Sequence, residues 1–202
     1  MITRIGVIYQ DANSLGFLRG LRDRLQCRAE FIPPPTAIGK TKRLPRRQAK
    51  RAWSYFRKKE ADLVVRFTDA DGDRWQDVQR GELQDAPSEA ESLWVCGVAV
   101  NNPEEWLYLD RAHLAAVLEV PLEELDDPEH RTPRIKAALA RLTSPEEGKS
   151  DVVARIVRDA PREVFRRWLL DDALRRFYTD RRAAAAASVC DTPNELEASE
   201  DE

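Results

Sequence analysis

Three carboxylates at alternate positions follow a Val-rich stretch of this chain. Asp69, Asp71 and Asp73 come directly after residues 62–67, whose pattern is typical of a buried strand. In an extended segment alternate side chains point the same way, so we expect these carboxylates to converge. Like charges repel at short range, and a hard cation with oxygen ligands relieves that repulsion. The spacing predicts a Mg²⁺ or Mn²⁺ site at these three residues.

This segment has two other interpretations. Asp71-Gly72 is also an ordinary turn sequence, and acid-rich loops are common on protein surfaces. A calcium loop of the EF-hand type needs Gly at its sixth position and Glu at its twelfth. Counted from Asp69, those positions hold Arg74 and Arg80, so the EF-hand is excluded and the turn remains an alternative.

A second group of residues has the chemistry to bind phosphate. Residues 40–60 carry ten bases and one acid, although the whole chain of 202 residues has a net charge of −3. The candidates for nucleic-acid contact are Lys42, Arg43, Arg46, Arg47, Lys50, Arg51, Arg57 and Lys58. A row of such side chains attracts phosphates whatever the base sequence. The alternative is a solvated charged helix.

Hydrophobic periodicity indicates the elements that must position these groups. Strands are expected at residues 2–9, 29–32, 62–67 and 93–100. Helices are expected at residues 15–25, 44–60, 102–120, 134–142, 151–158 and 162–182. Strands alternate with helices before residue 120, which predicts an α/β fold with a parallel sheet and a helical C-terminal part.

The expected sheet places the candidate residues along one edge. In open parallel sheets the functional site lies beyond the carboxyl ends of the strands. Residues 10–14, residues 69–73 and the start of the helix at Asn102 are therefore expected on one rim.

Composition completes the expected organisation. We expect an α/β core at residues 1–120, a helical extension packed on it at 121–182, and a disordered acidic tail at 183–202. Cys27, Cys96 and Cys190 show no metal-binding spacing and are expected to be free thiols. No apolar stretch is long enough for a membrane span and no signal peptide is evident, so a cytoplasmic protein without membrane association is expected.

The order of elements and motifs resembles the Toprim domain, the metal-binding catalytic fold of primases, topoisomerases and overcoming-lysogenization-defect type nucleases. Residues 102–110, Asn-Pro-Glu-Glu-Trp-Leu-Tyr-Leu-Asp, are similar to the E-A-W-L-L-A-D signature of a small bacterial Toprim-like family. Asp127-Pro128 and Thr132-Pro133-Arg134 resemble that family's segment ending in Pro-Lys. The resemblance covers roughly residues 1–180.

The resemblance implies roles for individual residues. Asp69 and Asp71 match the family's D-x-D, and Glu104, Trp106 and Asp110 match its E-x-W…D segment. A Toprim domain places a Glu after its first strand, where this chain has Gln10, and an amide cannot act as a general base. The implied catalytic set is Asp11, Asp69, Asp71 and Glu104, with Asp11 substituting for the missing Glu.

Three hypotheses about function follow. The first is metal-dependent cleavage of nucleic acid, which the resemblance places in bacterial antiviral defence beside an ATP-dependent partner protein. The second is a catalytically impaired Toprim-like subunit that binds nucleic acid or regulates. The third is an adaptor whose basic helix docks an acidic protein surface. Glu104 has a simpler alternative role, since acids favour the first turn of any helix.

Overall fold

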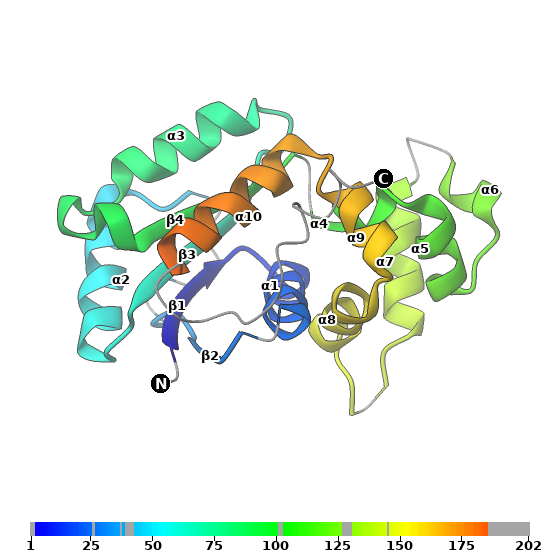
Figure 1. Ribbon diagram of the computed structural model, residues 1–202, viewed down its shortest axis with the longest axis horizontal. Helices are drawn as coiled ribbons and strands as arrows, with labels where there is room; N and C mark the ends of the chain where they lie inside the picture. Colours follow the sequence, from blue (N-terminus) through cyan, green and yellow to red (C-terminus); the bar gives the residue numbers. More distant parts are fainter. Residues whose placement is uncertain are drawn as a thin grey trace, which may run out of the picture. The chain divides into compact units, whose positions relative to one another are not determined.

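A four-stranded parallel sheet forms the centre of this molecule's first compact unit. The computed structural model describes residues 3–25, 27–36, 38, 43–100, 103–126, 131–144 and 146–185. The strands are β1 (Thr3–Tyr9), β2 (Ala29–Ile32), β3 (Leu63–Asp69) and β4 (Trp94–Ala99). They lie in the order β2-β1-β3-β4, and every pairing is parallel (Figure 1). The predicted α/β class is confirmed.

The described chain divides into two compact units that alternate along the sequence. Within the described residues, the first unit draws on 3–11, 27–100 and 172–185, and the second on 12–25 and 103–171. Neither unit is one continuous stretch. The bounds of these units differ from the division expected from composition, which places a core at residues 1–120 and a helical extension at residues 121–182.

Helices cover both faces of the sheet in the first unit. The helices are α2 (Arg46–Lys58), α3 (Trp75–Asp85) and α10 (Asp172–Ala185), with a 3₁₀ turn at Ser88–Leu93. The Phe56 ring of α2 packs directly over Gly6 of β1, and Phe177 of α10 packs over Gly97 of β4. Because Gly6 and Gly97 point to opposite faces in the strand register, α2 and α10 lie on opposite sides. Val78 of α3 packs with Cys96 and Val98, on the α2 side.

In the second unit the regular elements of the described residues are all helices. They are α1 (Ala12–Arg24), α4 (Pro103–Tyr108), α5 (Arg111–Leu118), α6 (Leu122–Leu125), α7 (Arg131–Arg141), α8 (Lys149–Asp159) and α9 (Arg162–Trp168). Their buried side chains include Phe17, Trp106, Phe165 and Trp168. The ring centroids of Phe17 and Trp106 lie 5.1 Å apart, which joins α1 to α4.

The closest helix packing in the second unit depends on two glycines of α1. A Cβ atom at Gly16 would lie 2.5 Å from the Ser150 carbonyl oxygen, and one at Gly20 would lie 2.6 Å from the Ala154 carbonyl oxygen. Both neighbours are backbone atoms of α8 that cannot move independently of the helix. The four-residue spacing puts the glycines on one face of α1, so the two helix backbones approach closely.

Several element boundaries differ from the sequence-based expectation. The helix expected at 102–120 is interrupted at Leu109 and Asp110, and the one expected at 162–182 becomes α9 and α10. Helix α3 was not expected at all. The predicted tail begins at residue 183, whereas α10 continues to Ala185, and residues 186–202 lie outside the described part.

The cysteines and the membrane expectation can be compared with the structure in part. Cys96 is a buried free thiol, as predicted, but Cys27 is disulfide-bonded, so the prediction of free thiols is wrong there. Among the helices described, none has the length and apolar character needed to cross a bilayer.

We expect Gly20→Ala to lower the free energy of unfolding by about 1–3 kcal/mol, because the added methyl forces α1 away from α8. Gly81→Ala is the matched control. Gly81 also lies inside a helix, but a Cβ there meets nothing within 4 Å, so the change should raise stability by up to about 1 kcal/mol. Urea titration of both variants measures the difference, and equal effects at the two positions would contradict the close-packing argument.

Candidate functional site

Gln10 lies where the sheet's connections diverge. The chain leaves β1 toward β2 on one side and leaves β3 toward β4 on the other, so the carboxyl ends of β1 and β3 flank the topological switch point. Gln10 follows β1 directly, and its Oε1 accepts hydrogen bonds from Thr68 Oγ1 (3.1 Å) and the Asp69 backbone N (3.2 Å). Gln10 and Asp69 therefore meet on one rim, as the sequence predicts.

The carboxylates after β3 are arranged by a tight turn. Asp71 and Gly72 have φ values of 51° and 89°, and the Asp73 backbone N donates to the Ala70 carbonyl oxygen at 3.0 Å. Positive φ at both central residues is the property of a type I′ turn, for which Asp-Gly is a preferred sequence. The expectation of one extended segment from Asp69 to Asp73 is wrong, and the turn interpretation is correct for the backbone.

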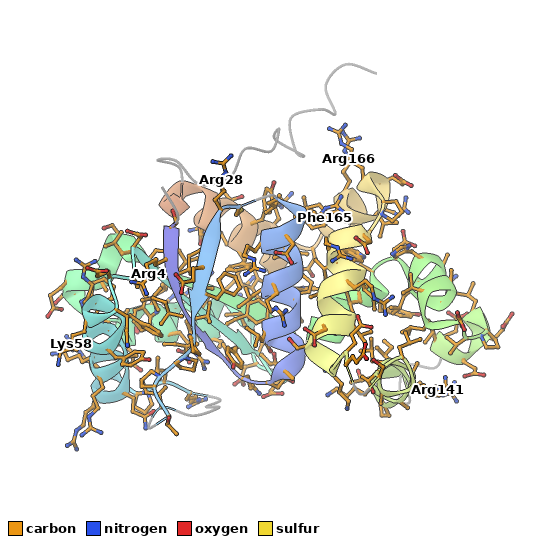
Figure 2. The ribbon with its side chains drawn as sticks, turned by 90° about the horizontal axis from the view of Figure 1, so that it is seen from below. Arg4, Arg28, Lys58, Arg141, Phe165 and Arg166 are labelled. Carbon is orange, nitrogen blue, oxygen red and sulfur yellow. The ribbon has the colours of Figure 1, made fainter. Side chains whose placement is uncertain are left out.

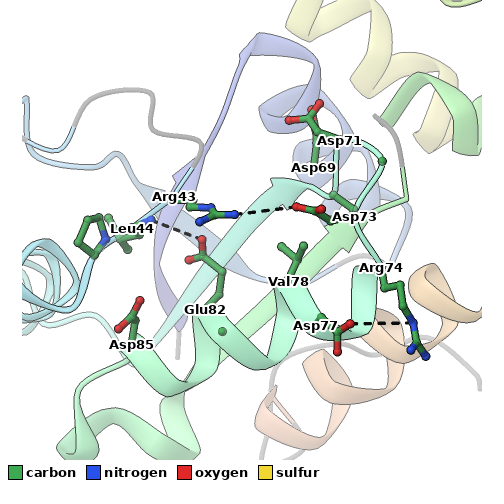
Figure 3. A pocket seen from close by; sticks show the side chains of 14 residues that line it. Arg43, Leu44, Asp69, Asp71, Asp73, Arg74, Asp77, Val78, Glu82 and Asp85 are labelled. Atoms are coloured by element: carbon green, nitrogen blue, oxygen red, sulfur yellow. Dashed lines mark hydrogen bonds and ion pairs between the residues drawn. The ribbon is translucent and has the colours of Figure 1, made fainter.

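The turn forms one wall of an acidic cavity of about 830 Å³. The ionisable residues that line it are the acids Asp69, Asp71, Asp73, Asp77, Glu82 and Asp85 and the bases Arg43 and Arg74. All three predicted metal ligands are therefore among the residues that line this cavity. Figure 3 shows the Asp73 carboxylate in an exposed ion pair with Arg43, at 3.9 Å.

The carboxylates that line the cavity are suitable ligands for a hard cation, but they do not form a complete coordination shell. Carboxylate oxygens are the ligands that Mg²⁺ takes, usually one or two per site with waters or phosphates completing the shell. Within the described part of the chain, no three His, Cys, Asp or Glu side chains are grouped closely enough to hold an ion together. Asp69 and Asp71 are the residues that would hold it, and the metal site stays a prediction.

The other two predicted catalytic residues, Asp11 and Glu104, differ in how much of them the structure describes. Asp11 directly follows Gln10 and is half-buried. Glu104 lies in α4, and its side chain is outside the described residues, as are Asn102 and Lys42. The expected place of the Asn102 helix start on the rim therefore stays a prediction.

A buried ion pair supports the cavity from beneath. Arg66, in the middle of β3, is fully buried, and its Nε donates to Glu82 Oε2 at 3.1 Å. Glu82, on α3, also accepts the Leu44 backbone N on Oε1 at 3.4 Å, as Figure 3 shows. This one carboxylate joins β3, α3 and the segment that leads into α2. Burial, and then the nearby Glu82 charge, raise the pKa of the Cys96 thiol, which suits Cys96 to packing rather than nucleophilic chemistry.

The basic side chains of α2 form a separate surface. A shallow groove of about 460 Å³ runs along the helix and is lined by Arg47, Lys50, Arg51, Ser54, Tyr55 and Lys58. The opposite face of the helix, with Ala49, Ala52 and Phe56, is buried in the core. Figure 2 shows the Lys58 side chain of α2 pointing away from the sheet. We call this surface the basic groove.

Three of the other predicted phosphate contacts are described by the structure and do not line the basic groove. Arg43 lines the acidic cavity instead. Arg46 and Arg57 are exposed but do not line the groove, and the Arg57 guanidinium lies over the Trp53 ring, 5.5 Å from its centroid.

Two residues of the family-like segment have structural roles in the second unit. Trp106 is buried, and its Nε1 donates to Asp171 Oδ1 at 3.1 Å. Asp110 caps α5 by accepting the His113 backbone N at 3.1 Å and also binds the Arg167 guanidinium. Burial opposes ionisation of Asp110, but these donors outweigh it and lower its pKa. Trp106 therefore serves packing, and Asp110 serves as the cap of α5.

Sequence reasoning missed Glu82 and its helix. The available signal was Arg66, a charged residue within the otherwise apolar β3, because a buried arginine needs an acidic partner.

No protein-family model, no curated protein and no solved structure matches this chain.

We expect Glu82→Leu to lower the free energy of unfolding by about 3–5 kcal/mol, because it leaves the Arg66 guanidinium buried without this carboxylate. The double variant Arg66→Met, Glu82→Leu should be more stable than Glu82→Leu alone, since it removes both charges. Arg80→Met, which breaks an exposed pair with Asp77, should change little. Urea unfolding curves compare the three, and a double variant no more stable than Glu82→Leu would contradict the ion-pair interpretation.

Proposed function

We propose that this protein binds nucleic acid through the basic groove of α2. The observation that supports the proposal best is the groove's composition. Four cations, a serine and a tyrosine line it, and no carboxylate is among the described residues that do so. Cations in such a row neutralise backbone phosphates and release their counterions, which gives affinity for any base sequence.

The position of the arginines within α2 favours a role in binding over that of an ordinary solvent-exposed helix face. Arg46 and Arg47 lie in the first turn, which contains no acidic residue. A cation there opposes the helix dipole by about 0.3–1 kcal/mol at an exposed position. No side chain caps the helix at Pro45 either. Local rules that a sequence breaks at an exposed surface tend to mark functional sites.

Reversing charge in the groove tests this function. We expect the double variant Arg47→Glu, Arg51→Glu to bind oligonucleotides much more weakly. The negative slope of log affinity against log salt should become less steep by about 2, one for each lost phosphate contact. The variant should still fold, because Arg47 and Arg51 are both exposed and Glu at position 47, in the first turn, complements the helix dipole.

The matched control is a double variant with the same change in charge outside the groove, Arg28→Glu, Arg80→Glu. Arg28 is exposed just before β2, at the amino ends of the strands, and Arg80 is exposed on α3 (Figure 2 labels Arg28). Fluorescence anisotropy at several salt concentrations measures both variants. Equal losses in the two would show that net charge alone, and not the basic groove, governs binding.

A second candidate function is metal-dependent cleavage of nucleic acid at the rim. The contact of Gln10 with Asp69 favours it, because it places position 10 beside the D-x-D as the Toprim resemblance implies. A cation on Asp69 and Asp71 would polarise the scissile phosphate and stabilise its developing charge. Antiviral defence in bacteria and an ATP-dependent partner belong to the same proposal. A catalytically impaired subunit is the alternative, since the Gln10 amide cannot take a proton.

We expect Gln10→Glu to create or raise Mg²⁺-dependent cleavage by about 10²–10⁴-fold, because the new carboxylate supplies a general base at nearly the same volume. The carboxylate can accept the same two hydrogen bonds from Thr68 and Asp69. Cleavage of a labelled oligonucleotide is followed with Mg²⁺ and with chelator.

Two further variants test whether cleavage takes place at this rim. Asp69→Asn should abolish any cleavage, and Asp11→Asn should abolish wild-type cleavage if Asp11 serves as the base. Cleavage that survives both changes would place the reaction elsewhere. No cleavage by wild type or by Gln10→Glu, together with salt-sensitive binding, would leave the basic groove as the function.

A further inference from the structure

The basic groove contains one aromatic ring among its lining residues. Tyr55 is half-buried and packs against the hydrophobic core of the first unit. Its ring centroid lies 5.5 Å from that of Phe56, in an edge-to-face arrangement. Phe56 is fully buried, so the Tyr55 ring is supported from the core while it also lines the groove. A ring held in this way loses little side-chain freedom when a ligand contacts it.

Helical spacing places cations on both sides of this ring. Residues three and four positions apart are neighbours on a helix surface. Arg51 precedes Tyr55 by four residues and Lys58 follows it by three, and both line the same groove. From Arg47 to Lys58 the helix rises about 16 Å, at about 1.5 Å per residue. The ring therefore lies within a continuous row of positive charge.

The other aromatic residue of α2 is placed differently. Trp53 packs against the core, is not among the residues that line the groove, and has the Arg57 guanidinium over its ring. Its ring is therefore already in contact with a cation. Tyr55 is the residue whose position suits contact with a ligand in the groove.

From this arrangement we infer that the basic groove selects single-stranded nucleic acid, with a base stacked on Tyr55 and the adjoining phosphates on Arg51 and Lys58. Proteins that bind single strands combine a basic groove with aromatic side chains on which bases stack. In a duplex the bases are stacked on one another, so Tyr55 has no base to contact and only the phosphate contacts remain. This inference rests on the proposed nucleic-acid binding and names its substrate class.

Three ligands of equal length separate the contribution of bases from that of phosphates. They are a single-stranded oligonucleotide, its duplex, and a single strand with abasic sites, which keeps the phosphates and removes the bases. We expect wild type to bind the intact strand about 5- to 150-fold more tightly than the abasic strand, the range measured for stacking on one aromatic residue. It should also bind the intact strand more tightly than the duplex. Fluorescence anisotropy at one fixed salt concentration measures all three.

Two substitutions then assign the preference to the ring. Tyr55→Leu should bring the ratio of intact to abasic affinity close to one, because it weakens binding of the intact strand much more than binding of the abasic strand, and Tyr55→Phe should keep the ratio. Circular dichroism checks that Tyr55→Leu folds. The wild-type comparison of intact and abasic strands needs no variant, so it tests the inference even if that variant is unstable.

The outcomes distinguish this inference from the function beneath it. Equal wild-type affinity for intact and abasic strands, or for strand and duplex, would overturn the single-strand inference while salt-sensitive binding upheld the proposed function. A ratio unchanged in Tyr55→Leu would overturn the role of the ring. Absence of binding to all three ligands would overturn both. Displacement by heparin with no dependence on bases would show that the groove accepts polyanions generally, which also contradicts the inference.

Discussion

The Arg66 guanidinium must find a negative partner inside the protein, and much of the first unit is arranged around that need. Arg66 is fully buried on β3, where an unpaired charge would be strongly destabilising. Glu82 supplies the partner from α3 and at the same time accepts the Leu44 backbone N. One carboxylate that lines the acidic cavity therefore links α3 to β3 and to the segment that precedes α2.

This arrangement separates charge along one short stretch of chain. Residues 43–45 line the acidic cavity, and residues from Arg47 onward line the basic groove. The two surfaces are therefore contiguous in sequence but opposite in sign. A phosphate backbone is attracted to the groove and repelled by the cavity, unless a cation offsets the carboxylates. Binding along α2 and metal-assisted chemistry at the rim therefore have opposite electrostatic requirements.

The sequence predicts the sheet well and the cavity poorly, for identifiable reasons. Val- or Ile-rich segments predict β1, β3 and β4, and a short segment that ends at the prolines 33–35 predicts β2. The apolar stripe of α2, with Ala52 and Phe56, predicts its buried face. Helix α3 escaped notice because only Glu82 among its residues is buried, so it lacks a strong apolar stripe. Extended geometry was assumed after Asp69, although Asp71-Gly72 had a known turn preference.

Contacts that join distant residues were beyond sequence patterns altogether. The bonds from Thr68 and Asp69 to Gln10 span 58 and 59 positions and depend on strand order, which periodicity does not report. The pairing of Glu82 with Leu44 likewise spans 38 positions. The family-like residues Trp106 and Asp110 make contacts of the same kind, since Trp106 binds Asp171 across 65 positions and Asp110 binds Arg167 across 57.

Helix α10 covers part of the sheet but is synthesised long after the strands. Its Phe177 packs against Phe67 and over Gly97, so it covers the sheet face opposite α2. The strands are complete by Ala99, yet this helix begins only at Asp172, more than seventy residues later. During synthesis the strands emerge from the ribosome well before their cover, with apolar surface exposed to other chains. Fragments that end before Asp172 should consequently be prone to aggregate, and a chaperone would have its longest opportunity to act in that interval.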